Sequence, residues 1–270
     1  PELADVPALA RLRAQDIAAG TGSALPDPAM VEAEGAGPAS WTRQQVLVED
    51  GDGTVRGWLI VHDRAAGRAL VWAYFDRELP EIEEVAGAVY AWAERQAVAM
   101  AQLRGIDATR LDASPFQGDE AQRGWLRAAG YAHRRTWLHM TRPVSPDEEV
   151  PPLREGVTIR GVEKHDNGQP VAADLQHVHR VLEESFADHF NNYRESFPEF
   201  VQRLREDPGH RWDHWWIAEV TPTESTPEET GEHVPAGATV CSVLSADADG
   251  AEGSYVEYIG VNRNARGRGV

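Results

Sequence analysis

The run Ser254-Tyr255-Val256-Glu257-Tyr258-Ile259-Gly260-Val261, followed shortly by Arg266-Gly267-Arg268-Gly269-Val270, carries the most structural information in this chain. The first run has the β-branched and aromatic residues that are typical of a strand. The second predicts a turn in which several backbone N–H groups point toward one spot, beside guanidinium charge. A helix after such a turn would add the positive end of its dipole. The pair therefore predicts a binding site for a phosphate or pyrophosphate.

The composition indicates a folded, acidic protein. The chain has 270 residues, of which 41% are hydrophobic, and this length suits one large domain or two ordinary ones. Its net charge is −18, from 44 acidic and 26 basic residues. Nucleic acids and anionic membranes are bound mainly through Lys and Arg, so such a surface repels them. We therefore expect neither as a partner, and the sequence leaves the oligomeric state open.

Few residues could support other kinds of site. Cys241 is the single cysteine, which excludes an intramolecular disulfide and a multi-cysteine zinc site. We expect no metal. No charged-then-apolar signal segment opens the chain, and no apolar run approaches the ~20 residues that span a bilayer. We therefore expect a soluble, cytoplasmic protein.

A linker divides the chain into two segments of domain size. Residues 143–152 are rich in proline and charge and have no apolar periodicity. We predict domains over residues 1–142 and 156–270, joined by a linker over 143–155. A second loose stretch, residues 221–237, is rich in Thr, Glu and Pro. Since it lies between two strand-like runs, we expect a long hairpin loop there.

Both segments follow one order of elements. In the second, apolar spacing predicts helices along Leu175–Phe186 and from Ser196, where Ser196 and Glu199 have capping-box spacing. The expected strands there are Val157–Arg160, Trp215–Val220, Ala238–Ser245 and Ser254–Val261. In the first segment we expect one helix over Val6–Ala19, a second that begins at Pro80 and a third that ends at Gly130-Tyr131. The strands expected there are Gln45–Glu49, Val55–His62, Arg68–Phe75, Thr109–Ala113 and Arg134–Thr141.

This order, helices and then an antiparallel meander that ends in a Gly-rich turn, resembles the GNAT superfamily of N-acetyltransferases. The acyl-CoA motif of that family is R/Q-x-x-G-x-G/A. Its first five positions match Arg266, Gly267, Arg268, Gly269 and Val270, and its sixth would be residue 271. In the first segment, Trp125–Tyr131 is similar to the later family segment "FLxxxGF". The resemblance implies two tandem α/β (α+β) units, each a mixed, mostly antiparallel sheet flanked by helices, with the second unit incomplete at Val270.

The resemblance also implies an activity. The expected reaction is transfer of an acetyl group from acetyl-CoA to a primary amine of a small molecule. Tandem units resemble the mycothiol synthase group in particular, which acetylates a cysteinyl amine. A non-catalytic acyl-CoA-binding or interaction protein is the alternative from a different class. In the family, the strand before the motif contacts the pantetheine arm and thioester, which implies contacts from Ile259, Gly260 and Val261.

The first segment departs from this pattern at its turn. After the strand Arg68–Phe75 come Asp76-Arg77-Glu78-Leu79-Pro80-Glu81, with no glycine. Close approach of a backbone to a pyrophosphate needs glycine, because a Cβ blocks contact and disfavours positive φ. Glu81, Glu83 and Glu84 fill the predicted first helical turn, where they repel an anion. We therefore predict that the first unit does not bind CoA productively and is a degenerate repeat that serves packing or substrate shaping; an unusual second active site is the alternative.

Acetyl transfer to an amine needs a polarised thioester carbonyl and a base for the amine. Backbone N–H groups of the strand could act like an oxyanion hole. On a strand, alternate residues share a face, so Glu257 lies on the same side as Ile259 and Val261. Glu257 is the candidate base; a solvated strand glutamate or a substrate-orienting charge is the alternative. By resemblance, the general acid is a tyrosine beyond residue 270.

The expected acceptor site draws on four further residues. Tyr255 shares the strand face of Glu257. The other three lie between the two predicted helices of the second unit, a segment that in the family often lines the acceptor site: Asp188, His189 and Tyr193.

Overall fold

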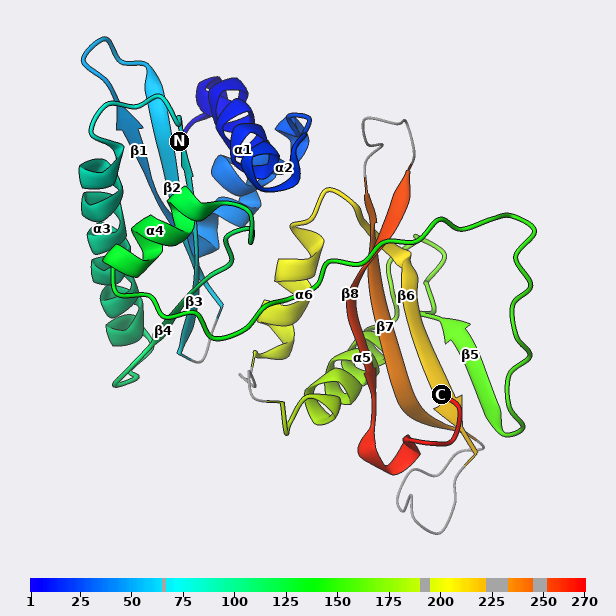
Figure 1. Ribbon diagram of the computed structural model, residues 1–270. Helices are drawn as coiled ribbons and strands as arrows, with labels where there is room; N and C mark the ends of the chain where they lie inside the picture. The colour runs from blue at the N-terminus through cyan, green and yellow to red at the C-terminus, as the bar shows by residue number, and fades with distance from the viewer. Residues whose placement is uncertain (65–66, 190–194, 222–232, 245–251) are drawn as a thin grey trace. The chain divides into compact units, whose positions relative to one another are not determined.

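The computed structural model describes residues 1–64, 67–189, 195–221, 233–244 and 252–270 (Figure 1). They form two four-stranded sheets, each flanked by helices, so the predicted α/β fold class is confirmed. The chain divides into two compact units. The first comprises Pro1–Ala132, Tyr193–His210 and Leu244–Gly253, and the second His133–Asn192, Arg211–Val243 and Ser254–Val270. The tandem repeat and the boundaries at residues 142 and 156 stay predictions.

The first unit is built on a meander. Strands β1, β2 and β3 pair antiparallel in sequence order, and β4 pairs parallel to β3. The strands are β1 (Arg43–Glu49), β2 (Val55–Asp63), β3 (Arg68–Phe75) and β4 (Arg110–Ala113). The helices are α1 (Val6–Thr21), α2 (Pro28–Gly35), α3 (Ile82–Leu103) and α4 (Glu120–Ala128), with 3₁₀ turns at Leu3–Asp5 and Pro38–Thr42.

Alternation along β2 sends side chains into two separate cores. Trp58 and Ile60 pack with buried residues of α1 and α2, whereas Leu59 and Val61 pack with buried residues of α3 and α4. The period-2 pattern of the strand thus places helices on both faces of the sheet, as Figure 1 shows.

The second unit contains a sheet in the order β5-β6-β7-β8, covered on one face by α5. Its elements are β5 (Val157–Gly161), α5 (Ala172–Ser185), β6 (His210–Val220), β7 (Val234–Leu244), β8 (Gly253–Val261) and a 3₁₀ turn at Arg263–Ala265. Helix α6 (Phe197–Arg205) belongs to the first compact unit, where Glu206, its C-cap, forms a buried ion pair of 3.1 Å with Arg43. The predicted capping box of Ser196 and Glu199 is present.

Several expected boundaries need correction. The predicted strand Arg134–Thr141 is wrong, because these residues form no helix or strand and belong to neither sheet. The helix expected from Pro80 begins at Ile82, after Glu81 adopts a positive φ of 55° as its N-cap. The expected loop over 221–237 ends earlier, since β7 begins at Val234, and its residues 222–232 lie outside the described ranges. In the described ranges, no helix combines the length and apolar character needed to cross a membrane.

Candidate functional site

The end of β8 is joined firmly to its neighbours. The backbone N–H of Asn262 donates to the carbonyl of Ala236 on β7 over 2.7 Å. Its side-chain oxygen accepts from the N–H of Asn264 over 3.2 Å and so caps the following 3₁₀ turn, while its amide nitrogen donates to Glu184 of α5. This residue therefore fixes where the Arg/Gly turn leaves the sheet.

The turn itself needs glycine. Gly267 and Gly269 have φ values of 80° and 91°, in the left-handed region that other residues rarely adopt. Among the residues that the structure describes, the N–H groups of Gly267, Gly269 and Val270 donate to no acceptor. Unpaired amides in such a turn provide donors for an anion.

The two arginines of the turn are held by carbonyls rather than carboxylates. Arg266 donates to the carbonyl of Ser185 over 3.1 Å, and Arg268 donates to that of Thr221 over 2.9 Å. The other terminal nitrogen of Arg268, Nη1, is buried and has no acceptor in the described part of the chain. A phosphate oxygen would satisfy this orphaned donor, so the donor set of the turn fits the pyrophosphate of CoA.

Strand β8 lies at the edge of the described sheet. Successive strand residues direct their N–H groups to opposite edges. Asn262 bonds to β7, whereas the carbonyl of Val261 accepts from Arg266. By this alternation, the N–H groups of Val261 and Ile259 face away from β7, where a thioester carbonyl could reach them.

Gly260 has a packing role that the sequence did not indicate. A Cβ at this position would lie 2.9 Å from the Cβ of Ser185 and 3.1 Å from Leu182 on α5. Glycine thus allows α5 to approach β8. Val261 packs in a small cluster with Val157, Val220, Ala236, Ala265 and Val270, while the side chain of Ile259 is 65% exposed.

Glu257 is half-buried and has a defined partner. Its Oε1 accepts from the hydroxyl of Ser242, a buried residue of β7, over 3.1 Å. Tyr255 is 41% exposed, and its ring lies 6.1 Å from that of His139. Burial raises the pKa of Tyr255, and the nearby Glu257 and Tyr258 raise it further.

Two of the three residues expected on the acceptor side lie in the described chain. Asp188 forms an exposed ion pair of 2.8 Å with Arg263, and its hydrogen bond from that guanidinium lowers its pKa. His189 stacks edge-on against Phe186 at 5.7 Å, and Phe186 contacts Tyr258 of β8 at 6.4 Å. Tyr193 lies outside the described residues.

The structure adds residues that sequence reasoning missed. Ser242 could not be found because the register between β7 and β8 has no local signal. Phe186 appeared only as the last apolar residue of a predicted helix, although it joins His189 to β8. No group of three or more His, Cys, Asp or Glu residues in the described ranges could hold a metal ion.

The corresponding position of the first unit has a different arrangement. Arg77, just after β3, forms ion pairs with Asp16 and with Asp119, the latter at 2.6 Å, and lies 5.0 Å over the ring of Trp125. Both aspartates are buried. Burial raises the pKa of Asp16 to about 6, against the opposing effect of Arg77. The guanidinium here is already neutralised within the protein.

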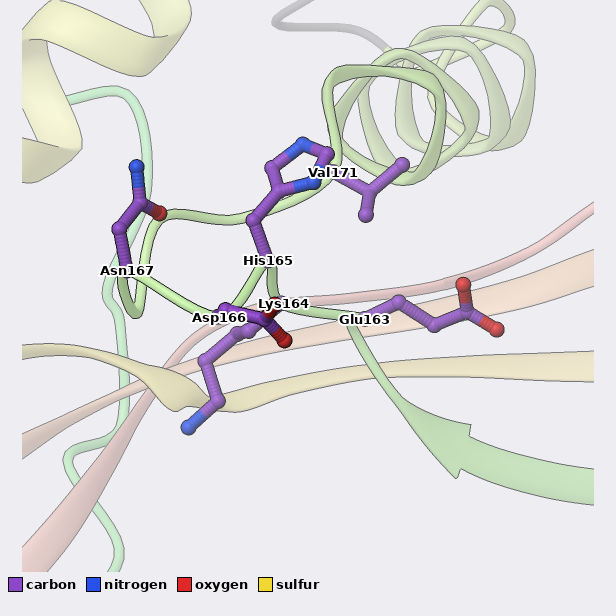
Figure 2. Close-up of a pocket in the computed structure, with 6 residues that line it drawn as sticks. All are labelled: Glu163, Lys164, His165, Asp166, Asn167 and Val171. Carbon is purple, nitrogen blue, oxygen red and sulfur yellow. The ribbon is translucent and has the colours of Figure 1, made fainter.

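An open pocket of about 640 Å³ lies elsewhere, in the loop between β5 and α5 (Figure 2). Its lining residues are Glu163, Lys164, His165, Asp166, Asn167 and Val171. The loop is closed by hydrogen bonds between its own backbone groups, including His165 N–H to the carbonyl of Gln169 over 2.8 Å. Figure 2 shows the side chains of Glu163 and Lys164 pointing in different directions. The labelled side chains do not point toward one common spot in this view.

Comparison with solved structures identifies the fold. A GCN5-related N-acetyltransferase from Sphaerobacter thermophilus matches 100% of this chain and 76% of its own, with a TM-score of 0.64 and 20% sequence identity. A GCN5-related glucosamine N-acetyltransferase region of a fungal multi-domain GH3 β-N-acetylglucosaminidase matches 98% of this chain and 31% of its own, with a TM-score of 0.58 and 12% identity. This chain has the GNAT fold. No protein-family model and no curated protein sequence match it.

Proposed function

We propose that this protein is a GNAT-type acyltransferase that moves an acetyl group from acetyl-CoA to a primary amine of a small molecule. The observation that carries this proposal is the turn Arg266–Val270 at the end of the edge strand β8. This turn has backbone amides that are unpaired within the described chain. It also has two arginines that have no carboxylate partner there, and together these donors would form a site for a pyrophosphate.

Each part of the site has a step to perform. The amides of Gly267, Gly269 and Val270, together with Arg268, would hold the pyrophosphate. The thioester is the group that bound acetyl-CoA supplies. The N–H groups of Ile259 and Val261 would polarise its carbonyl and position it as an oxyanion hole does.

Glu257 would take the proton from the amine, held in place by the hydroxyl of Ser242 at 3.1 Å. The amine nitrogen then forms a bond to the carbonyl carbon, and the carbon–sulfur bond breaks. The products are an amide and the CoA thiol, which takes its proton from a general acid.

The charge of the chain indicates the class of amine that would accept the acetyl group. The net charge of −18 favours a cationic amine, with contacts from Tyr255, His189, Asp188 and Tyr193. A cysteinyl amine, as in the mycothiol synthase group, is the more specific version. We place the reaction in the cytoplasm and expect no nucleic acid or membrane as a partner.

Calorimetric titration with acetyl-CoA, followed by an assay of CoA release over a panel of amines, tests the proposal. We expect one acetyl-CoA to bind per chain and at least one amine to be acetylated. Binding without turnover would support the non-catalytic acyl-CoA-binding alternative instead. A chain that binds no acetyl-CoA would refute both.

A matched pair of glycine variants tests whether the turn is the binding site. Gly267 and Gly22 both have positive φ, 80° and 92°, and neither has an atom within 4 Å of an added Cβ. Gly267→Ala and Gly22→Ala therefore impose similar backbone strain. Only Gly267→Ala should weaken acetyl-CoA binding; equal affinities of the two variants would place the cofactor elsewhere.

A further inference from the structure

Arg154, which precedes β5, lies directly on the Arg/Gly turn. A Cβ on Gly269 would overlap the Arg154 side chain, lying 2.8 Å from its Nε and 2.9 Å from its Cγ. Gly269 has a φ of 91° and no side chain, so it leaves space for the arginine stem. A residue from the predicted linker thus contacts the predicted phosphate-binding turn.

The backbone holds Arg154 in this place. Its carbonyl accepts from the N–H of Val157, the first residue of β5, over 3.1 Å. Val157 is buried and packs in the same cluster as Val261, Ala265 and Val270. The start of β5 and the end of the chain therefore share one small core, which keeps Arg154 against the turn.

The arginines at the turn lack ion pairs among the described residues. Across the described ranges, Arg154, Arg266 and Arg268 form no ion pair with a carboxylate. Other arginines of the same unit are paired: Arg142 with Glu148 at 2.7 Å, and Arg160 with Asp174 at 2.6 Å. In a chain of net charge −18, the turn and the residue that contacts it thus carry three arginines without such partners among the described residues. A bound anion would supply the counter-charge that these arginines lack.

We propose that Arg154 is a third phosphate-binding arginine of the CoA site, supplied by the segment before β5. This inference rests on the proposed function. The chemistry it requires is a charge-assisted contact from the guanidinium to a phosphate of CoA, either in the pyrophosphate or at the 3′ position.

Calorimetric titration of the full chain with CoA and with 3′-dephospho-CoA tests the proposal. Arg154→Ala should weaken CoA binding by about 10- to 100-fold, as expected for a lost hydrogen bond to a charged group. An equal loss with both ligands would place Arg154 on the pyrophosphate. A loss with CoA alone would place it on the 3′-phosphate. Either result supports the proposal.

Two further variants make the test specific. Arg142→Ala removes the same charge from a residue just before the predicted linker. Since Arg142 has its own carboxylate partner, Glu148, CoA binding should stay within twofold of wild type. Arg154→Lys keeps the charge without the planar fork and should have an intermediate affinity. If wild type and Arg154→Ala bind CoA equally, the proposal is wrong while the proposed function stands. If wild type itself does not bind CoA, the proposed function fails.

Discussion

At the scale of single residues, Glu257 and Ser242 carry the proposed chemistry. The hydrogen bond from the buried hydroxyl of Ser242 holds one carboxylate oxygen of Glu257 in a defined position. A base must be oriented as well as present, since proton transfer depends on geometry first. Ser242 is thus a positioning residue in this proposal.

Replacing Glu257 by Gln should separate chemistry from binding. Glu257→Gln keeps the shape of the side chain but removes the base, so we expect kcat to fall by about 10²- to 10⁴-fold. The Kd for acetyl-CoA should stay within about twofold, because the proposed cofactor contacts lie at Arg154 and residues 259–270 and do not include Glu257. Steady-state kinetics and calorimetry on the same sample measure both.

Glu252 provides the matched control for this variant. It is exposed just before β8, and Glu252→Gln changes the net charge by the same amount. Unchanged kcat in Glu252→Gln with reduced kcat in Glu257→Gln is expected. Full turnover by Glu257→Gln would remove Glu257 from the mechanism.

At the scale of elements, local signals predicted most helices and strands. The Asp50–Gly53 turn predicted the β1–β2 hairpin, and the Ser196 capping box predicted α6. Residues 134–141 show where such signals stop. Trp137, Leu138 and Met140 favour a strand, yet all three are exposed and the segment joins neither sheet. A strand needs a partner, and the alternation of its side chains does not supply one.

The candidate site also has one part that local sequence predicts and another part that it does not. Its continuous part, residues 257–270, was predictable because the strand and the Gly-rich turn are adjacent in sequence. Ser242 and Arg154 were not, because a neighbouring strand and a distant linker bring them to the site. Gly260 was predictable as an important glycine, but its contact with α5 depends on how the helix packs.

The close contact between α5 and β8 leads to a stability prediction. Gly260→Ala would place a Cβ 2.9 Å from that of Ser185, so the strand or helix must shift, and we expect a loss of about 1–3 kcal/mol in the free energy of unfolding. Urea denaturation followed by circular dichroism measures this loss.

A helical glycine with open space around it serves for comparison. Gly87 of α3 is exposed, and an added Cβ there would meet nothing within 4 Å. Gly87→Ala should therefore stabilise the protein by about 1 kcal/mol through helix propensity. If Gly260→Ala were equally harmless, the packing argument for Gly260 would be wrong.

At the scale of the whole molecule, the two units differ in what their arginines bind. The comparison is between Arg77, which follows β3, and Arg266 and Arg268, which follow β8. The first unit pairs Arg77 with two buried aspartates, whereas the second leaves Arg266 and Arg268 bonded only to carbonyls among the described residues. The internal pairing supports the prediction that the first unit does not bind CoA. It also leaves a buried carboxylate, Asp16, beside a second one, Asp119, with consequences for the stability of the chain.

Two buried groups of the first unit, Asp16 and His62, change the free energy of unfolding with pH in opposite directions. Burial raises the pKa of Asp16 to about 6, and burial together with Arg43 and Arg64 lowers that of His62 to about 2. Since folded Asp16 holds its proton more tightly than unfolded Asp16, it lowers the free energy of unfolding as pH rises from about 4 to 6. His62 resists protonation when folded, so it raises that free energy over the same range. In wild type the two effects oppose each other.

Replacing Asp16 by Asn should reveal the effect of His62. Asp16→Asn keeps an oxygen for Arg77 but no longer titrates, so the free energy of unfolding of the variant should rise more steeply from pH 4 to 6 than that of wild type. From pH 4 to 6, the free energy of unfolding of the variant should therefore gain up to about 3 kcal/mol relative to that of wild type. Urea denaturation at several pH values measures it, with the exposed Asp107→Asn as the control that should follow wild type. Parallel curves for wild type and Asp16→Asn would show that Asp16 has the same pKa in the folded and unfolded chain, and that its burial beside Asp119 is offset fully by Arg77.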